Sequence, residues 1–373
     1  MLKIAILSLA DINNYGDAFF PIVAKSQLRK RIPEAEITLV TNIEYDSGLY
    51  KTTAYSKEYI AEFDAIILAG GELISPYDNE TISKIYGKEY CGMPSDIAHG
   101  WLDLESPFKA WFSVGAHPVL FDYPNEVEQA LSKLDYLSVR GTISKKVLER
   151  GFIINNGDIR VMPDLGWIFP HYIDTYDSSD VWQLCGLEKS QLYIVFQAIE
   201  DLEIDSYASE IANALVSFQK NNDIKVVLVP IMHTKKQWFE SSALKKISDA
   251  SGGVLSFLPK AHNILETGTI LKYAKFFLGC SLHGAITSLA YGKPAFNIRG
   301  AINTKLQDLH AARFRSTCFC NTWEVLPGVL ERLTHEAENE TDKKYALMYA
   351  EYMRYRVERE FDNLAARIKR QCS

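Results

Sequence analysis

Short, nearly continuous apolar runs alternate with segments of helical periodicity along most of the chain. The first run, Leu2–Leu9, is typical of a strand buried on both faces of a parallel sheet. Similar runs follow at Ile37–Thr41, Ala65–Ala69, Lys109–Val114, Tyr136–Val139 and Arg160–Met162. Strands that alternate with helices indicate a doubly wound α/β sheet.

The alternation stops between residues 170 and 190, where polar and helix-breaking residues gather: Pro170, Asp174, Asp177, Ser178, Ser179 and Asp180. We place an interdomain linker there. A second set of apolar runs follows at Leu192–Ile199, Lys225–Ile231, Val254–Phe257, Phe276–Gly279 and Pro294–Ile298. The expected fold is α/β, with two doubly wound Rossmann-like domains over residues 1–172 and 187–335. We expect them to face a cleft at the carboxyl ends of their strands.

The last segment, residues 336–373, has a different pattern. From Glu338 onward there are few helix breakers, and apolar or aromatic residues recur at helical spacing. This periodicity predicts one long amphipathic helix that packs back across the domains.

The composition supports a folded chain of two domains and argues against several classes of protein. The chain has 373 residues, more than one ordinary domain of ~100–200 residues, and 47% of them are hydrophobic. A net charge of −7 argues against a strongly basic nucleic-acid or anionic-membrane binder. No apolar run approaches the ~18 residues that span a bilayer, and Met1–Leu9 is expected to be a buried strand rather than a signal peptide.

The cysteines bear on the compartment and on metals. They are scattered along the chain at Cys91, Cys185, Cys280, Cys318, Cys320 and Cys372. None forms a CxxC pair, and histidines and carboxylates do not cluster with them as metal ligands. We therefore expect reduced thiols, a cytoplasmic location and no bound metal.

The first candidate site follows the first strand, at Asn13-Asn14-Tyr15-Gly16-Asp17. A glycine between a strand and a helix lets the backbone approach a ligand, and N–H groups at the start of a helix favour anions. Asp17 either caps this helix or acts as a base aimed into the cleft. The spacing alone favours the cap.

The second candidate site is Leu68-Ala69-Gly70-Gly71-Glu72, at the end of the third strand. Two glycines permit a tight turn under a substrate. A GxGxxG fingerprint is absent, which argues against a nicotinamide enzyme. The connection that runs from Glu72 to Pro107 is unusually long, and it is either a surface excursion or part of an acceptor site.

Two further strand ends carry charged residues. Arg140, in Ser138-Val139-Arg140-Gly141-Thr142, either binds a carboxylate or phosphate with its planar fork or forms a structural salt bridge. Asp164, in Met162-Pro163-Asp164, either lies at the floor of the cleft or caps a turn.

The strongest local signal is Gly279-Cys280-Ser281-Leu282-His283-Gly284-Ala285. A buried strand runs into an apolar helix here, with Ser281 and His283 at the turn. The N–H groups of the helix start and an imidazole would together make a phosphate site. Tyr291-Gly292-Lys293-Pro294 follows, and then Asn297 and Arg299. No Ser–His–Asp nucleophile elbow and no HExxH sequence occurs.

Taken in order, these motifs resemble the polysaccharide pyruvyl transferase family over most of the chain. The shared blocks are the Asn-x-Gly-Asp start, the Gly-Gly pair, the Val-Arg…Ser segment, the Pro-Asp pair and Ser-Leu-His-Gly…Tyr-Gly-Lys-Pro. The resemblance implies a fold similar to glycosyltransferases of the B type. It also implies transfer of the enolpyruvyl carbons of phosphoenolpyruvate onto two hydroxyls of one sugar, which makes a cyclic pyruvate ketal in a cell-surface polysaccharide. That chemistry requires no metal, nucleotide or other cofactor.

The resemblance also implies roles for single residues. The expected catalytic residues are His283, Asp17 and Asp164. The expected donor-binding residues are Arg140, Ser281, Gly284 and Arg299, and the expected acceptor-binding residues are Asn14, Gly70, Gly71 and Glu72. His283 would contact phosphate or donate a proton, and Asp17 or Asp164 would be the base. Two positions depart from the family pattern, because many members carry Arg in place of Ser281 and a third glycine in place of Glu72.

The expected partners are a small-molecule donor and a sugar or lipid-linked oligosaccharide acceptor, with no nucleic acid. Peripheral membrane association and the oligomeric state stay open. Two other functions also stay open. One is a nucleotide-sugar glycosyltransferase, for which Glu266 is the nearest candidate carboxylate for a ribose. The other is a non-catalytic carbohydrate-binding relative, which Ser281 in place of Arg favours.

Overall fold

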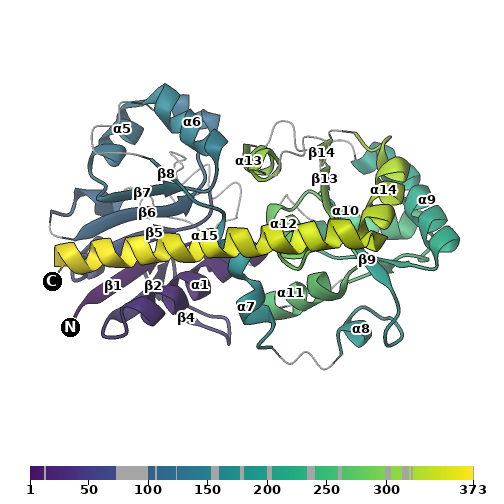
Figure 1. Cartoon of the computed structure of the whole chain (residues 1–373), viewed down its shortest axis with the longest axis horizontal. Coiled ribbons are helices and arrows are strands. Elements are labelled where there is room, and N and C mark those ends of the chain that lie inside the picture. Colours follow the sequence, from purple (N-terminus) through teal and green to yellow (C-terminus); the bar gives the residue numbers. More distant parts are fainter. Residues whose placement is uncertain are drawn as a thin grey trace. The chain divides into compact units, whose positions relative to one another are not determined.

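The computed structural model describes residues 1–11, 14–72, 100–105, 107–122, 124–152, 159–176, 180–199, 204–232, 240–258, 263–298, 304–312, 319–320 and 322–372. The chain divides into two compact units (Figure 1). The first consists of Met1–Leu165 and Arg354–Ser373, and the second of Gly166–Met353.

The first unit is built on an eight-stranded sheet in the order β3-β4-β2-β1-β5-β6-β7-β8. Its strands are β1 Lys3–Leu7, β2 Glu36–Thr41, β3 Tyr45–Asp46, β4 Lys51–Ala54, β5 Ala65–Ala69, β6 Phe108–Val114, β7 Tyr136–Val139 and β8 Arg160–Val161. All neighbours are parallel except β3 and β4, which pair antiparallel at the sheet edge. The helices between them are α1 Tyr15–Arg31, α2 Lys57–Ile60, η2 Gly100–Asp103, η3 Pro118–Asp122, α5 Pro124–Ser132 and α6 Thr142–Gly151.

The second unit is built on a six-stranded, fully parallel sheet in the order β11-β10-β9-β12-β13-β14. Its strands are β9 Tyr193–Phe196, β10 Lys225–Leu228, β11 Ser256–Phe257, β12 Phe277–Gly279, β13 Ala295–Ile298 and β14 Phe319–Cys320. Its helices are α7 Pro170–Ile173, α8 Val181–Leu184, α9 Ile204–Asn222, α10 Glu240–Ala250, α11 Ile264–Tyr273, α12 Leu282–Ala290, α13 Thr304–Ala312 and α14 Leu326–Glu338, and η4 Leu165–Ile168 leads into the unit.

The central strands of both sheets are completely buried, as their apolar runs predict. Every residue of β5 and β9 is buried, and Trp101 and Trp111 pack in the core of the first unit while Trp323 packs in that of the second. The predicted fold class is therefore confirmed: the protein is α/β, each unit is a doubly wound Rossmann-like sheet, and a long helix ends the chain.

That final helix, α15 Glu340–Cys372, begins in the second unit and ends in the first (yellow in Figure 1). In the first unit the Phe361 ring centroid lies 4.6 Å from that of Phe112. Glu360 accepts hydrogen bonds from Tyr136 and Arg160. The helix thus forms part of the first unit, although its sequence lies far from the rest of that unit. None of the helices in the described part of the chain is long and apolar enough to cross a membrane.

The strand order reverses next to the first strand of each unit. From β1 the chain goes to β2 on one side, and β5 lies on the other; β9 has the same relation to β10 and β12. In open α/β sheets, ligands bind outside the carboxyl ends of the strands at such a reversal. A ligand is therefore expected at the segments that follow β1 and β5, and at those that follow β9 and β12.

Candidate functional site

The segment after β1 turns into α1 through Asn14. The Asn14 side chain accepts a hydrogen bond from the Gly16 N–H at 3.3 Å, so Asn14 caps the helix and Asp17 does not. Asp17 lies in the first turn and is only partly buried. A carboxylate there gains from the helix dipole, and the role as a base remains a prediction.

The segment after β5 is the Gly70-Gly71 turn. Both glycines have a left-handed backbone, with φ of 73° and 72°. A Cβ at Gly70 would lie 2.6 Å from the Phe20 ring, so a larger residue would force α1 away from the strand. The glycines therefore allow the strand end to pass directly under α1, which brings the two segments together. Their role in acceptor binding stays a prediction.

Arg140, at the end of β7, bridges two carboxylates. Its guanidinium lies 3.0 Å from Glu72 and 3.6 Å from Asp164, and its side chain is only 3% exposed. A Cβ at Gly115 would lie 2.5 Å from the same guanidinium, so the absence of a side chain at Gly115 makes room for it. The salt bridge, one of the two alternatives that the sequence leaves open, is present. Binding of the donor anion by Arg140 is a further prediction.

This ion cluster joins residues from three strand ends. Glu72 follows β5, Arg140 follows β7 and Asp164 follows β8, while Asp164 is buried and Glu72 is about one-third exposed. Among the described contacts, the Arg140 guanidinium lies against both carboxylates. Glu72 is thus the more accessible carboxylate, and it is held in place by a buried arginine.

Asp11 is a candidate that the sequence analysis missed. It follows β1 and is 4% exposed, and burial raises the pKa of its carboxyl to about 6. The Tyr50 hydroxyl donates a hydrogen bond to the neighbouring Ala10 carbonyl at 2.8 Å. Burial, together with nearby groups that include Asp11, raises the pKa of Tyr50. A carboxyl that titrates close to neutrality can both donate and accept protons. The signal was available, because Asp11 directly follows an apolar run that ends at the expected ligand edge.

The corresponding segment of the second unit runs from β12 into α12. Ser281 caps α12, because its hydroxyl accepts a hydrogen bond from the Gly284 N–H at 3.1 Å. His283 lies in the first turn, where it is partly buried, and its ring centroid is 6.3 Å from that of Phe169. The structure therefore puts His283 at a helix N-terminus beside the strand-order reversal, as the motif predicts. Its contact with phosphate is not tested.

Gly284 has a packing role in this structure. A Cβ at this position would lie 2.6 Å from the Phe277 ring and 2.7 Å from the Ile231 side chain. The N–H of Gly284 is already bonded to Ser281. These contacts explain why a glycine is needed in the first turn of α12, and donor binding by Gly284 remains only a prediction.

A buried polar network holds the β12–α12 turn and was also missed from the sequence. The Gln197 side chain, just after β9, accepts hydrogen bonds from the N–H groups of Cys280 and Ser281 at 2.7 and 2.9 Å. Asn297 donates to the carbonyls of Gly279 and Ser281 at 3.0 and 3.2 Å. The turn is therefore fixed from both neighbouring strands.

The network continues away from the turn through His310 and Glu240. The Nε2 atom of His310 lies 2.9 Å from Oδ1 of Asn297. The Glu240 carboxylate accepts hydrogen bonds from the N–H groups of Ile231 and Met232, and burial raises its pKa to about 7. Polar residues that come from four separate segments of the chain give no local motif, which is why the sequence pattern did not reveal them.

Three expectations concern residues outside the described part of the chain. Arg299, expected to bind the donor, lies there, as do Asn13 and most of the long connection that follows Glu72. Within the described residues, no three His, Cys, Asp or Glu side chains are grouped so that they could hold a metal ion. The expectation that no metal is needed stays a prediction.

Solved structures with similar folds place the chain in a structural class. The UDP-GlcNAc 2-epimerase from Methanocaldococcus jannaschii is 11% identical with a TM-score of 0.60, covering 95% of this chain and 100% of that chain. A glycosyltransferase from Rickettsia africae is 11% identical with a TM-score of 0.58 and 98% coverage of both chains. The UDP-GlcNAc 2-epimerase from Neisseria meningitidis, solved with UDP-GlcNAc, is 9% identical with a TM-score of 0.54, covering 95% and 99%. The fold is thus of the glycosyltransferase-B-like class.

The family follows from the sequence. The profile of the polysaccharide pyruvyl transferase family matches residues 14–300, which begin at the cap of α1 and include the segments after β5, β7, β8 and β12. The chain belongs to this family, as its motifs predict. No curated protein matches the sequence.

Proposed function

We propose that this protein is an enzyme that transfers a pyruvate ketal from phosphoenolpyruvate to two hydroxyls of one sugar during the synthesis of a cell-surface polysaccharide. The observation that carries the proposal is the family match, which extends across the ligand-edge segments of both units. The fold supports it as well, because both sheets end in polar segments at the reversal of strand order.

The reaction sets clear requirements for the site. A proton is added to the methylene carbon of phosphoenolpyruvate, which makes the adjacent carbon an oxocarbenium-like centre. One sugar hydroxyl attacks that carbon and gives its proton to a base. A second hydroxyl then closes the ring, and its proton leaves with the phosphate as the C–O bond to phosphate breaks. The products are one cyclic ketal and one inorganic phosphate. The site therefore needs cationic or N–H groups for the anion, a general acid and a general base.

The carboxylates of the first unit suit the proton transfers. Asp11 titrates near pH 6, so it can exchange protons at neutral pH, and Asp17 lies in the first turn of the helix that follows. Glu72 is accessible and held by Arg140, which suits a hydrogen bond from a sugar hydroxyl. In this proposal Asp164 and Arg140 position Glu72, and Asp17 or Asp11 serves as the base.

The start of α12 suits the donor phosphate. The helix N-terminus carries a partial positive charge, and His283 adds an imidazole in the first turn. The Gln197 and Asn297 side chains hold the preceding turn rigidly, so the site is preorganised. Ser281 adds no charge of its own, so in this proposal His283 contributes more of the donor binding than it would beside an arginine.

Thermal shift and calorimetry test the donor assignment. Phosphoenolpyruvate is expected to raise the melting temperature, and UDP-N-acetylglucosamine is not. His283→Ala should weaken phosphoenolpyruvate binding by about tenfold, since one charge-assisted contact is lost. The exposed His171 of α7 provides the matched control, and His171→Ala should leave the affinity unchanged. Stabilisation by the nucleotide sugar alone would instead favour a glycosyltransferase.

A further inference from the structure

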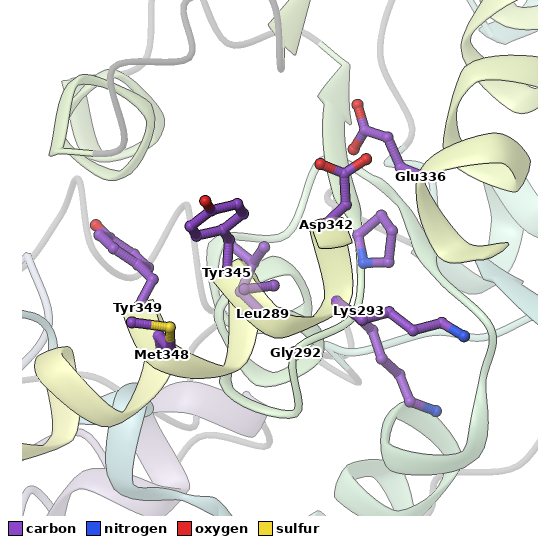
Figure 2. A pocket seen from close by; sticks show the side chains of 11 residues that line it. Leu289, Gly292, Lys293, Glu336, Asp342, Tyr345, Met348 and Tyr349 are labelled. Atoms are coloured by element: carbon purple, nitrogen blue, oxygen red, sulfur yellow. The ribbon is translucent and has the colours of Figure 1, made fainter. Parts of the chain in front are cut away.

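The second unit contains a cavity at the opposite end of α12 from His283, and Gly292, Lys293 and Pro294 of the Tyr-Gly-Lys-Pro block form part of its wall. It has a volume of about 400 Å³, which is in the range of small-molecule sites. It lies between the end of α12, the end of α14 and the start of α15 (Figure 2). Its walls include Gly292 and Pro294 after α12, Glu336 of α14, and Asp342, Tyr345 and Tyr349 of α15.

The cavity is at the opposite end of α12 from His283. Ser281 caps the start of this nine-residue helix, whereas Leu289 and Gly292 lie at its end, about 13 Å along the axis at 1.5 Å per residue. Pro294 immediately precedes β13, so the cavity opens near the amino edge of the sheet. The family site lies at the carboxyl edge, and the cavity is therefore a separate site.

The walls of the cavity are held by specific contacts. Gly292 has φ of 72°, and a Cβ there would lie 2.6 Å from the Leu347 side chain, so α15 packs directly on this turn. The Lys293 ammonium donates a hydrogen bond to the Ala274 carbonyl. The Tyr349 ring centroid lies 5.5 Å from that of Trp167 in an edge-to-face contact. A cavity whose walls are fixed in this way loses little entropy when it binds a ligand.

The lining combines apolar surface with balanced charge. Two lysines and two carboxylates line the cavity, and Lys343 and Glu336 are already paired with Glu340 and Arg332, so the formal charges balance. In Figure 2 the Tyr345 and Tyr349 rings lie at one end, and the carboxylates of Glu336 and Asp342 lie at the other. Carboxylates accept and lysines and tyrosines donate hydrogen bonds, which matches a ligand whose hydroxyls do both. The aromatic rings match the apolar face of a sugar ring.

Exposed residues extend this surface along α15. Tyr345, Met348 and Tyr352 are 65%, 56% and 55% exposed, and their spacing puts them on one face of the helix. A row of large apolar side chains that stays in water is a common mark of a binding surface. Because Tyr345 and Met348 also line the cavity, the row continues directly from it. The ligand is thus expected to be longer than one ring.

We propose that the α12–α14–α15 cavity binds a sugar residue of a neutral glycan, with neighbouring residues of the same glycan lying along Tyr345, Met348 and Tyr352. This would be an accessory glycan site that holds the polymer, distinct from the site of transfer. The proposal does not depend on phosphoenolpyruvate chemistry, because it needs only sugar recognition.

The test uses the full chain and a panel of methyl hexopyranosides and the corresponding neutral trisaccharides, measured by saturation-transfer NMR and calorimetry. A trisaccharide is expected to bind more tightly than its monosaccharide. Tyr345→Ala should weaken binding of the trisaccharide by about tenfold, since an aromatic anchor at the cavity mouth is lost. Tyr345→Phe should keep most of the affinity, and Tyr352→Ala should weaken the trisaccharide but not the monosaccharide.

Tyr273→Ala is the matched control, because Tyr273 is also exposed in the second unit but does not line the cavity. It should change the affinity by less than about twofold. The proposal is overturned if no sugar of the panel binds at tens of millimolar, or if Tyr345→Ala binds as tightly as Tyr273→Ala. His283→Ala separates the glycan-site proposal from the proposed transfer function. It should leave the affinity for the trisaccharide unchanged, whatever its effect on the affinity for phosphoenolpyruvate.

Discussion

Arg140 is a charged residue in a buried ion cluster, so its substitution affects the stability of the fold as well as any binding role. It is nearly fully buried and faces Glu72 and Asp164, and Asp164 is buried as well. Removing one partner of a buried pair leaves an uncompensated charge, which is far more costly than losing a pair on the surface. Arg140 is therefore expected to stabilise the fold in addition to any contact that it makes with a ligand.

We expect Arg140→Ala to lower the free energy of unfolding by about 3 kcal/mol, because it leaves Asp164 buried without its cation. Lys133 provides the control, since its salt bridge of 2.5 Å to the exposed Asp103 is at the surface. Lys133→Ala should change stability by less than about 1 kcal/mol. Urea denaturation measures both, and equal effects would contradict the account. Titration of the folded Arg140→Ala protein with phosphoenolpyruvate then tests the anion role separately.

Glu240 is expected to make stability depend on pH. Burial raises its pKa from an ordinary value of 4.5 to about 7, so between these values the folded state keeps a proton that the unfolded chain has lost. The contribution of this group to stability is present below pH 4.5 and is lost as the pH rises through 7. The glutamine of Glu240→Gln stays neutral at every pH. The melting temperature of this variant should therefore fall less between pH 5 and pH 8 than that of the unsubstituted protein. Parallel curves for the two proteins would contradict this assignment.

Residues at strand ends were predictable where a local motif marks them. Asn14, Gly70, Gly71 and Ser281 each lie at a turn whose residue types are unusual. The structure makes Asn14 and Ser281 helix caps and gives both glycines a left-handed backbone, whereas the binding roles expected for these residues stay predictions. Gln197 was not predictable, because it acts on a segment 84 residues away in the sequence, and Glu240 was not predictable, because it accepts hydrogen bonds from the backbone of another segment and no local motif marks it. Their partners are set by the packing of strands, which a local pattern does not contain.

In helix α12, the glycine of the Ser-Leu-His-Gly motif is required for the packing of the helix on its neighbours. Its glycine, Gly284, lies against Phe277 and Ile231, whereas Gly328 in α14 has nothing within 4 Å of where its Cβ would be. We expect Gly284→Ala to destabilise the protein by about 1–3 kcal/mol because it overpacks the core. Gly328→Ala should stabilise it by about 0.5–1 kcal/mol, because alanine favours the helix. Unfolding in urea decides, and the account is wrong if both substitutions have the same sign.

Elements with continuous apolar runs were predictable, and those without were missed. The central strands of both sheets appear where the runs predict them, because a strand buried on both faces leaves a clear signal. Strands β3, β4 and β14 were not predicted. They have two to four residues, and β4 is the largely polar Lys51–Ala54 at the edge region of its sheet, so no apolar run marks it.

Helix α15 contributes residues to both compact units. Its periodicity predicts a helix with a buried face, but periodicity does not say which sheet that face covers. The part from Arg354 onward belongs to the first unit, where Arg31 pairs with Asp362 at 2.6 Å and Phe361 packs on Phe112. The first unit is therefore incomplete until the end of the chain is present.

Deleting residues 354–373 should unfold the first unit selectively. The deletion removes four fully buried side chains, Val357, Phe361, Leu364 and Ile368. At roughly 1.5–3 kcal/mol each, their loss is comparable to the ~5–15 kcal/mol that stabilises a typical domain. Hydrogen exchange should show β1 and β6 losing protection while β9 and β12 keep it, and a shorter deletion of residues 370–373 should have little effect. Equal loss in both units would contradict this division.

The central claim, ketal transfer from phosphoenolpyruvate, is tested most directly by product mass. The full chain is incubated with phosphoenolpyruvate and a panel of nitrophenyl and lipid-linked hexosides, with and without EDTA, and parallel samples contain UDP-hexoses as the donor. The account predicts a product heavier than its acceptor by pyruvate less one water, one phosphate released per product, and the same yield with EDTA. A hexose added from a UDP-hexose, or no change in any acceptor while phosphoenolpyruvate stays intact, would contradict it.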